Sequence, residues 1–310
     1  MIAKAKRKFG ALRSTLLVAL AIALASFSPF EGTRLENSGK LNSWWKEVVK
    51  TKYGNVDFSS FTFRDINSIN RKTEKNLYDR CSRLLEKLPP YARNGRWLAA
   101  FDNRNQFCGL LSESRIVAQA GVKKGNEVYV NMFLNTIHLP NAQYLVDNIN
   151  YYTDSRGRII RVFCPDLKLK SRGRNQFAQK YSVKFKDGVR GDNCGHLIPQ
   201  ALNGPAEQIN YVPQRRDLNS GEILELEKKA INAKKAGRKV SYEIRLLYNG
   251  DEKRPYGFEN NVKVYDGNGK MLNNYTGIFD NNPKLKKYYD KQEKSSRKSS
   301  RQERKSNKRN

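Results

Sequence analysis

Histidine, cysteine and acidic residues are scarce in this chain of 310 residues. It has two histidines and four cysteines, and no two cysteines have the C-x-x-C spacing that is typical of structural zinc sites. A zinc site of that kind is therefore not expected. Acidic residues number 30 against 59 lysines and arginines, so the formal net charge is +29. This imbalance favours polyanions as partners, because a basic surface attracts them before any specific contact forms.

Long apolar runs are also missing. The apolar stretch over residues 16–25 is shorter than the ~20 residues that a membrane-spanning helix needs, so no stable membrane span is expected. It follows a basic start and ends in Ala-Leu-Ala, the small-x-small pattern that signal peptidases accept. We therefore expect residues 1–25 to be a signal peptide and the protein to be secreted. The alternative is an uncleaved signal anchor that tethers the chain to a membrane.

The positive charge is spread along the chain. The C-terminal segment, residues 284–310, carries +9 of the +29, which leaves +20 for the rest. Nucleic acid, heparin-like sugars and anionic lipids all suit such a surface; the alternative is that the lysines only keep the chain soluble. The segment has no aliphatic residue after Leu285, so we expect a disordered basic tail.

Secretion would place the four cysteines in an oxidising environment, where disulfides persist. The candidates are Cys81, Cys108, Cys164 and Cys194. Four cysteines allow three pairings, and the simplest joins 81 with 108 and 164 with 194. The alternative, four free thiols, applies if the chain is not exported.

Hydrophobic patterns predict helices and strands in both halves of the chain. The predicted elements are a helix over residues 76–88, a strand over 127–134, a hairpin over 150–163, a helix from 219 or 220 to 237, and strands over 240–248 and 258–265. Asn219 or Ser220 would cap the second helix, with Glu222 completing a capping box. This order of strand, loop, helix and strand predicts an α+β fold.

His196 is the first candidate for chemistry. It follows Asp-Asn-Cys-Gly in a polar stretch, and histidine suits proton transfer because its pKa lies near neutrality. Hard cations such as Mg²⁺ prefer oxygen ligands and keep most of their waters, so one amide or carboxylate suffices as an anchor. His138 has no acid or cysteine spaced around it, and we predict a structural role for it.

Four short motifs follow one another downstream of residue 194. They are Gly-His-Leu-Ile at 195–198, Asn-x-x-Pro-Gln at 210–214, Asp-Leu-Asn at 217–219 and Leu-Glu at 226–227. Their order and spacing resemble the DNA/RNA non-specific endonuclease family of the His-Me finger, or ββα-metal, superfamily. The segments 153–158 and 174–179 resemble the lead-in of its toxin-type branch.

The resemblance implies a ββα-metal nuclease core with an antiparallel sheet and a long helix, preceded by a mixed N-terminal region. It implies that His196 is the general base, that Asn219 binds Mg²⁺ (or Mn²⁺), and that Glu227 holds metal-bound water. Arg174 would hold a phosphate. The expected segments are a signal peptide over 1–25, a region of unknown role over 26–140, an endonuclease domain over 141–283 and the tail over 284–310.

One position departs from the family pattern Asp-Arg-Gly-His, because Cys194 stands where the family has an arginine. Arg190, Arg215 and Arg216, together with Arg174, are candidates to bind the substrate in its place. We therefore expect a secreted, metal-dependent endonuclease that cuts DNA and RNA with little sequence specificity, and an inhibitor protein is a further candidate partner. The alternative is a non-catalytic, polyanion-binding protein on a decayed nuclease fold.

Overall fold

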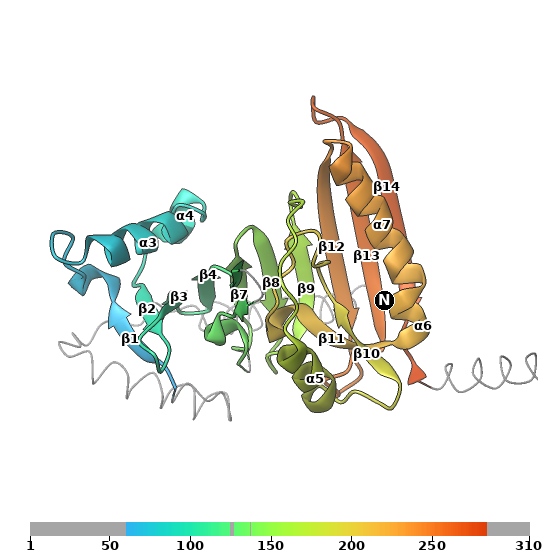
Figure 1. Ribbon diagram of the computed structural model, residues 1–310, viewed down its shortest axis with the longest axis horizontal. Coiled ribbons are helices and arrows are strands. Elements are labelled where there is room, and N and C mark those ends of the chain that lie inside the picture. Colours follow the sequence, from blue (N-terminus) through green and yellow to red (C-terminus); the bar gives the residue numbers. More distant parts are fainter. Residues whose placement is uncertain (1–59, 125–126, 137, 284–310) are drawn as a thin grey trace, which may run out of the picture. The chain divides into compact units, whose positions relative to one another are not determined.

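The computed structural model describes residues 60–283 apart from 125–126 and 137, all within the larger of two compact units, residues 41–310. The expected signal peptide and basic tail lie outside the described residues. Figure 1 shows one large sheet with helices packed against it, so the α+β fold expected from the sequence is confirmed. No helix of the described ranges is long and apolar enough to cross a membrane.

The large sheet has ten strands in the order β1-β2-β3-β4-β7-β8-β9-β12-β13-β14. Every neighbouring pair is antiparallel except β4 and β7, which run parallel. The strands are β1 (Thr62–Asp65), β2 (Leu98–Phe101), β3 (Phe107–Ser112), β4 (Arg115–Ala118), β7 (Gln143–Val146), β8 (Ile149–Thr153), β9 (Ile159–Cys164), β12 (Lys239–Leu247), β13 (Gly257–Tyr265) and β14 (Met271–Asp280). Because β4 pairs with β7, the sheet runs without a break across residue 140.

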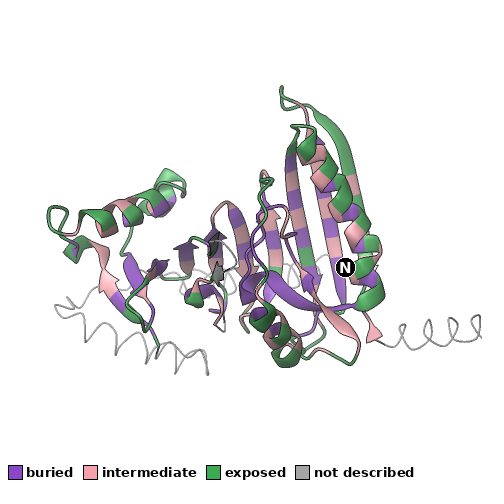
Figure 2. Ribbon diagram, viewed as in Figure 1, coloured by how far each residue is buried: buried purple, intermediate pink, exposed green. Residues whose placement is uncertain are grey.

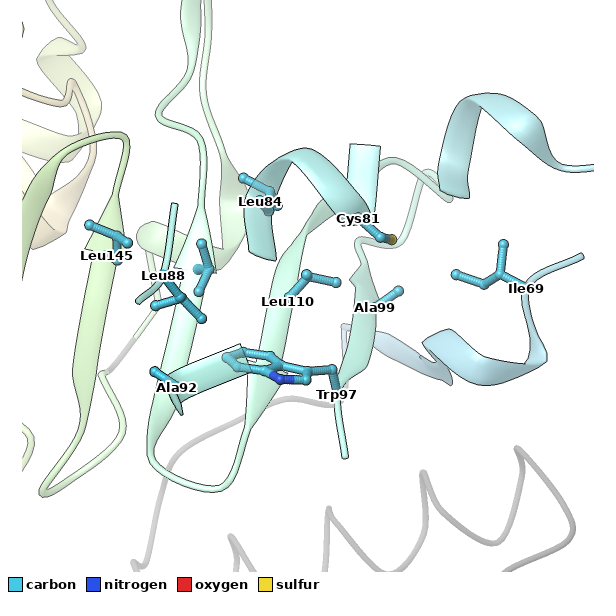
Figure 3. Close-up of a cluster of buried hydrophobic side chains, with 10 residues drawn as sticks. Ile69, Cys81, Leu84, Leu88, Ala92, Trp97, Ala99, Leu110 and Leu145 are labelled. Carbon is cyan, nitrogen blue, oxygen red and sulfur yellow. The ribbon is translucent and has the colours of Figure 1, made fainter. Parts of the chain in front are cut away.

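A separate hydrophobic cluster stabilises the N-terminal end of the sheet. Helices α3 (Lys75–Leu85) and α4 (Pro90–Arg93) contribute its outer part, and the strands beneath contribute Ala99 and Leu110 (Figure 3). Trp97 is fully buried there, and its Nε1 donates to the carbonyl of Arg93. The indole thus buries a large apolar surface without an unpaired donor.

The C-terminal strands alternate buried and more exposed positions, as Figure 2 shows by its alternating colours. Helix α7 (Glu222–Lys235) covers one face of β12, β13 and β14. It packs there through Ile223, Leu226 and Ala230. Burying a leucine- or isoleucine-sized side chain stabilises the fold by roughly 1.5–3 kcal/mol, so the apolar stripe of α7 fixes the helix on the sheet.

Strands β9 and β12 are neighbours in the sheet, but 74 residues separate them in the chain. These residues form several smaller elements. They are helix α5 (Gln176–Phe185), the hairpin β10 (Asp192–His196) and β11 (Tyr211–Arg215), helix α6 (Arg216–Ser220) and helix α7. The β10–β11 hairpin and the helices that follow it have the ββα order that the family resemblance implied.

The sequence-based elements differ from the structure at three places. Only Glu127–Tyr129 of the predicted 127–134 strand is a strand, β6, paired with β5 (Val122–Lys124), and Met132–Leu134 is a 3-10 helix. The capping prediction was wrong, because α7 begins after Gly221 and has no side-chain cap. Strand β14 was not predicted; most of its side chains are exposed, so it lacks a buried apolar stripe.

Candidate active site

His196 lies at the end of β10, directly opposite Tyr211 of β11. The two ring centroids are 5.0 Å apart with an interplanar angle of 58°. Residues directly opposite in an antiparallel pair project to the same face, so Tyr211 supports the imidazole from its side. Helix α5 packs against β11, the strand that carries Tyr211.

Gly195 is required by the packing of the hairpin. A Cβ at this position would collide with the side chain of Gln214, which is itself buried. Gln214 comes from β11 and fills the space above the glycine. Gly195 and Gln214 belong to two different motifs of the sequence, and they pack directly against each other.

Asn210 closes the loop that follows His196. Its Oδ1 accepts from the backbone N–H of Ile198 at 2.8 Å and from the Tyr151 hydroxyl at 3.0 Å. Its Nδ2 donates to the carbonyls of Ile198 at 2.9 Å and Pro205 at 3.1 Å. The residue is fully buried, and every hydrogen bond it makes is structural. This asparagine therefore fixes where His196 emerges from the hairpin.

The start of β10 is held by a buried ion pair. Asp192 accepts from Arg254 through both carboxylate oxygens, at 2.8 and 2.9 Å. Arg254 also donates to the carbonyl of Asn281 at 2.6 Å, which ties the hairpin to the end of β14. The sequence analysis assigned no role to Asp192 or Arg254. The only sequence feature that pointed to this pair was the position of Asp192 directly before Asn-Cys-Gly-His.

The imidazole of His196 is half-buried, and its Nε2 is enclosed without a hydrogen-bond partner among the described residues. Burial, and next the positive charge of Arg174, lower the pKa of His196 to about 4. The ring is therefore neutral near pH 7. A neutral imidazole has a lone pair with which to accept a proton.

Helix α6 places Asn219 beside the hairpin, since α6 contacts both β10 and β11. Asn219 lies within α6, and the helix breaks at Gly221 before α7 starts. A Cβ at Gly221 would crowd the carbonyl oxygen of Asp217, so the break favours glycine. Because Gly221 occupies the cap position of α7, the amide of Asn219 is not consumed by capping.

Glu227 lies in the second turn of α7 and is half-buried. In the part of the chain that the structure describes, its carboxylate has no ion-pair or hydrogen-bond partner. Burial raises the pKa of Glu227 to about 7, and no neighbouring cation counteracts it. A carboxylate that is desolvated and unpaired favours an arriving cation.

The four candidate arginines occupy two kinds of environment. Arg174, Arg190 and Arg216 are exposed, and Arg174 Nε donates to Gln200 Oε1 at 3.2 Å. Arg215 is buried, and its Nε donates to Asp217 at 3.0 Å. The Arg215 side chain is therefore buried and paired with an exposed aspartate, whereas the other three arginines are exposed.

All four cysteines carry free thiols, so neither expected disulfide is formed. Cys108 Sγ donates to the carbonyl of Gln106 at 3.3 Å, and Cys164 Sγ accepts from Asn148 at 3.4 Å. Cys164 is buried within the ten-stranded sheet, whereas Cys194 belongs to the separate β10–β11 hairpin. Burial raises the pKa of the Cys194 thiol to about 12, which leaves it protonated and a poor nucleophile.

The residues present fit a hydrated divalent cation better than a dehydrated one. Within the described residues no three histidines, cysteines or acids gather as a metal cluster. Zinc sites built on three or four such ligands therefore do not fit. Asn219 and Glu227 instead offer an amide oxygen and an unpaired, half-buried carboxylate. These suit a cation such as Mg²⁺ that keeps several of its own waters.

Comparison with known proteins agrees with this arrangement. Residues 140–266 match the family described as DNA/RNA non-specific endonuclease. The type VII secretion system protein EssD of Staphylococcus aureus (strain USA300) is 32% identical over 115 residues, which is 35% of this chain and 19% of that protein. The aligned part thus spans about a fifth of the length of this relative.

Two solved structures are similar at a lower level. An extracellular nuclease has 19% identity and a TM-score of 0.31, over 41% of this chain and 78% of that one. The Sda1 nuclease with bound zinc ion has 22% identity and a TM-score of 0.26, over 30% and 39%. The family match covers the hairpin, His196, Asn219 and Glu227. Residues 140–266 of this chain are thus similar to the DNA/RNA non-specific endonuclease family.

Proposed function

We propose that this protein is an exported endonuclease that hydrolyses phosphodiester bonds of DNA and RNA with little sequence specificity and depends on a divalent cation. The observation that carries the proposal is the state of His196. It is neutral, it is only half-buried at the end of β10, and it lies within the electrostatic reach of the exposed Arg174.

His196 acts as the general base. A neutral imidazole nitrogen accepts a proton from water, and the resulting hydroxide oxygen forms a bond to phosphorus. The bond between phosphorus and the leaving sugar oxygen then breaks. Tyr211 keeps the imidazole in place during this transfer, because the two rings contact each other and Tyr211 is buried. Proton transfer of this kind typically contributes 10²–10⁴-fold to the rate.

Asn219 and Glu227 would hold Mg²⁺, with Mn²⁺ as the alternative, through the amide oxygen and through metal-bound water. When bound, the cation neutralises charge on the scissile phosphate and on the leaving oxygen. Helix α6 positions the amide against the hairpin. The desolvated carboxylate of Glu227 gives up little by approaching a cation, because it has no partner to lose among the described residues.

Arg174, Arg190 and Arg216 would hold the phosphates of the strand. Arg174 is the first candidate to replace the family arginine at position 194, because its positive charge acts to lower the pKa of both His196 and Tyr211. Arg215 is excluded from this role by its burial and its bond to Asp217. Contacts to phosphate carry no sequence information, which accounts for broad specificity.

Export is proposed from the basic start, the apolar stretch and the Ala-Leu-Ala pattern of residues 1–25. The Staphylococcus aureus relative is named a secretion system protein, which supports the same conclusion. A nuclease made inside a cell and then exported needs protection before export, so an inhibitor protein remains part of the proposal.

Plasmid degradation by the purified full chain tests the proposal. Wild type should cut supercoiled plasmid and RNA with Mg²⁺ and stop when EDTA is added, and His196→Ala should lose at least about 10²-fold in rate. His138→Phe is the matched control, because it removes the other histidine at a buried position and should leave cleavage unchanged. If wild type only retards DNA in a gel and never cuts it, the protein is a polyanion binder instead.

A further inference from the structure

Helix α5 has three aromatic side chains on one flank, and the family motifs assign them no role. They are Phe177, Tyr181 and Phe185, spaced four residues apart. Phe177 is 75% exposed and Phe185 is 47% exposed. Exposed large rings are costly to hydrate, and three in line on one helix indicate an interaction surface. We name Phe177, Tyr181 and Phe185 the aromatic stripe.

The rings of the stripe follow one another along the helix. Phe177 and Tyr181 have centroids 6.2 Å apart at an interplanar angle of 31°, and Tyr181 and Phe185 are 4.0 Å apart at 30°. Positions i and i+4 are roughly 6 Å apart along a helix axis. The stripe is therefore a row of rings in which each ring is tilted by about 30° to the next.

The packing of α5 explains why this flank is exposed. Ala178 and Ser182 are fully buried and form the face toward the protein. Asn175 caps the helix by accepting from the N–H of Ala178 at 3.1 Å. Small residues on the packing face bring the helix close to the hairpin, and the large rings are left on the outer flank.

The surroundings of the stripe are positively charged. Residues 167–186 contain seven lysines and arginines and no acid. Lys180 and Lys184 are exposed beside the row of rings, and Lys184 Nζ lies 5.2 Å from the centroid of the Phe185 ring. Aromatic faces alternating with cations suit a partner that has both flat rings and negative charge.

The stripe begins beside the candidate active site. Arg174 comes immediately before the cap of α5, and its charge acts on His196. At its other end, Tyr181 and Phe185 border a cavity of about 180 Å³ whose walls include Ile159, Val212 and Tyr248. A strand that starts at Arg174 therefore passes three rings and reaches a recess.

We propose that the aromatic stripe of α5 stacks unpaired bases of a nucleic-acid strand whose phosphate lies at Arg174, so that this enzyme prefers single-stranded substrates. The identity of the ligand rests on the proposed nuclease function. Every base has a face that can stack, so the contact is independent of sequence. Paired bases are enclosed within a duplex, and the rings would meet only its backbone.

Binding measurements without hydrolysis test this inference. Fluorescence anisotropy in EDTA, with the full chain, would compare a labelled oligothymidylate with a DNA duplex of equal length. Phe177→Ala should weaken binding of the single strand about fivefold or more and change duplex binding less than about twofold. Tyr91→Ala is the matched control, because Tyr91 is 76% exposed on α4, outside the stripe, and this change should alter neither.

Two further variants separate stacking from apolar docking. Phe177→Trp keeps an aromatic face and should bind the single strand like wild type, whereas Phe177→Leu keeps only apolar surface and should bind as weakly as Phe177→Ala. Unchanged binding by Phe177→Ala, or wild-type affinity of Phe177→Leu, would overturn the inference; the latter would indicate a protein or lipid surface.

Plasmid cleavage distinguishes this inference from the function on which it rests. If wild type cuts plasmid but Phe177→Ala binds single strands with wild-type affinity, the stacking role of the aromatic stripe is contradicted and the nuclease function is supported. If wild type never cuts but Phe177→Ala loses affinity for single strands, the stacking role is supported and the nuclease function is contradicted.

Discussion

The ring of Tyr211 lies 5.0 Å from the ring of His196, at the paired position on the neighbouring strand. Tyr211 is almost fully buried, and its strand β11 packs against helix α5. The imidazole is thereby held from the side by a residue that is itself fixed by a helix. A base held in this way loses little entropy when it reaches the proton of water.

Variants of Tyr211 test whether its ring holds the imidazole of His196 in place or whether its hydroxyl takes part in the reaction. Tyr211→Phe keeps the ring and should retain cleavage within a few-fold, whereas Tyr211→Leu leaves space beside the imidazole and should lower kcat about tenfold or more. KM should change little, because Tyr211 does not reach the substrate. Thermal denaturation of both variants checks that they are folded, and equal kcat values would contradict the supporting role.

Gly195→Ala should destabilise the protein through its contact with Gln214. The new methyl group collides with a buried side chain, and overpacking of this kind costs about 1–3 kcal/mol. The double variant Gly195→Ala/Gln214→Ala should recover part of that loss, because the second change removes the obstacle. Urea denaturation of the two single variants and the double variant gives the coupling energy, and strict additivity would contradict the contact.

Breaking the Asp192–Arg254 pair should be strongly destabilising. Arg254→Ala leaves a buried carboxylate without its bidentate partner, which costs about 3–5 kcal/mol. Asp192→Asn/Arg254→Met removes both charges and should be more stable than Arg254→Ala. Denaturation curves at pH 7 measure both, and a loss below about 1 kcal/mol for Arg254→Ala would show that water replaces the arginine.

Stability should fall in mild acid because of His138. Burial, and to a smaller extent the charge of Lys186, lower the pKa of His138 to about 3, against an ordinary value of 6.5. Between these two pH values the unfolded chain binds more protons, so the stability that neutral His138 permits is present above pH 6.5. It is lost progressively as the pH falls toward 3.

At pH 5 the loss attributable to His138 is about 2 kcal/mol, since each unit of pKa shift corresponds to about 1.4 kcal/mol. His138→Phe preserves the ring that packs against Tyr144 and removes the titration. The difference in unfolding free energy between pH 7 and pH 5 should therefore be smaller in this variant than in wild type. Equal differences would show that His138 is not the titrating group.

Several parts of the fold were predictable because they depend on local patterns. The hairpin over 150–163 and the long helix before Gly237 follow from alternation and from 3-to-4 spacing, and the structure confirms both. Gly237 has a positive φ of 72°, which is the conformation expected after a helix. Strand β14 was missed because its side chains are largely exposed and show no buried apolar stripe, although it forms a hairpin with the preceding strand β13.

The sequence by itself indicated the resemblance to the family, through the order of short motifs around His196, Asn219 and Glu227, and it predicted an attraction to polyanions from the net charge. Both are properties of composition and spacing. Only the tertiary structure decided which of those residues are free to act. Burial lowers the pKa of His196, burial also takes Arg215 off the surface, and the packing of α5 exposes Phe177. These outcomes depend on desolvation and on contacts between segments far apart in the chain, which no local pattern encodes.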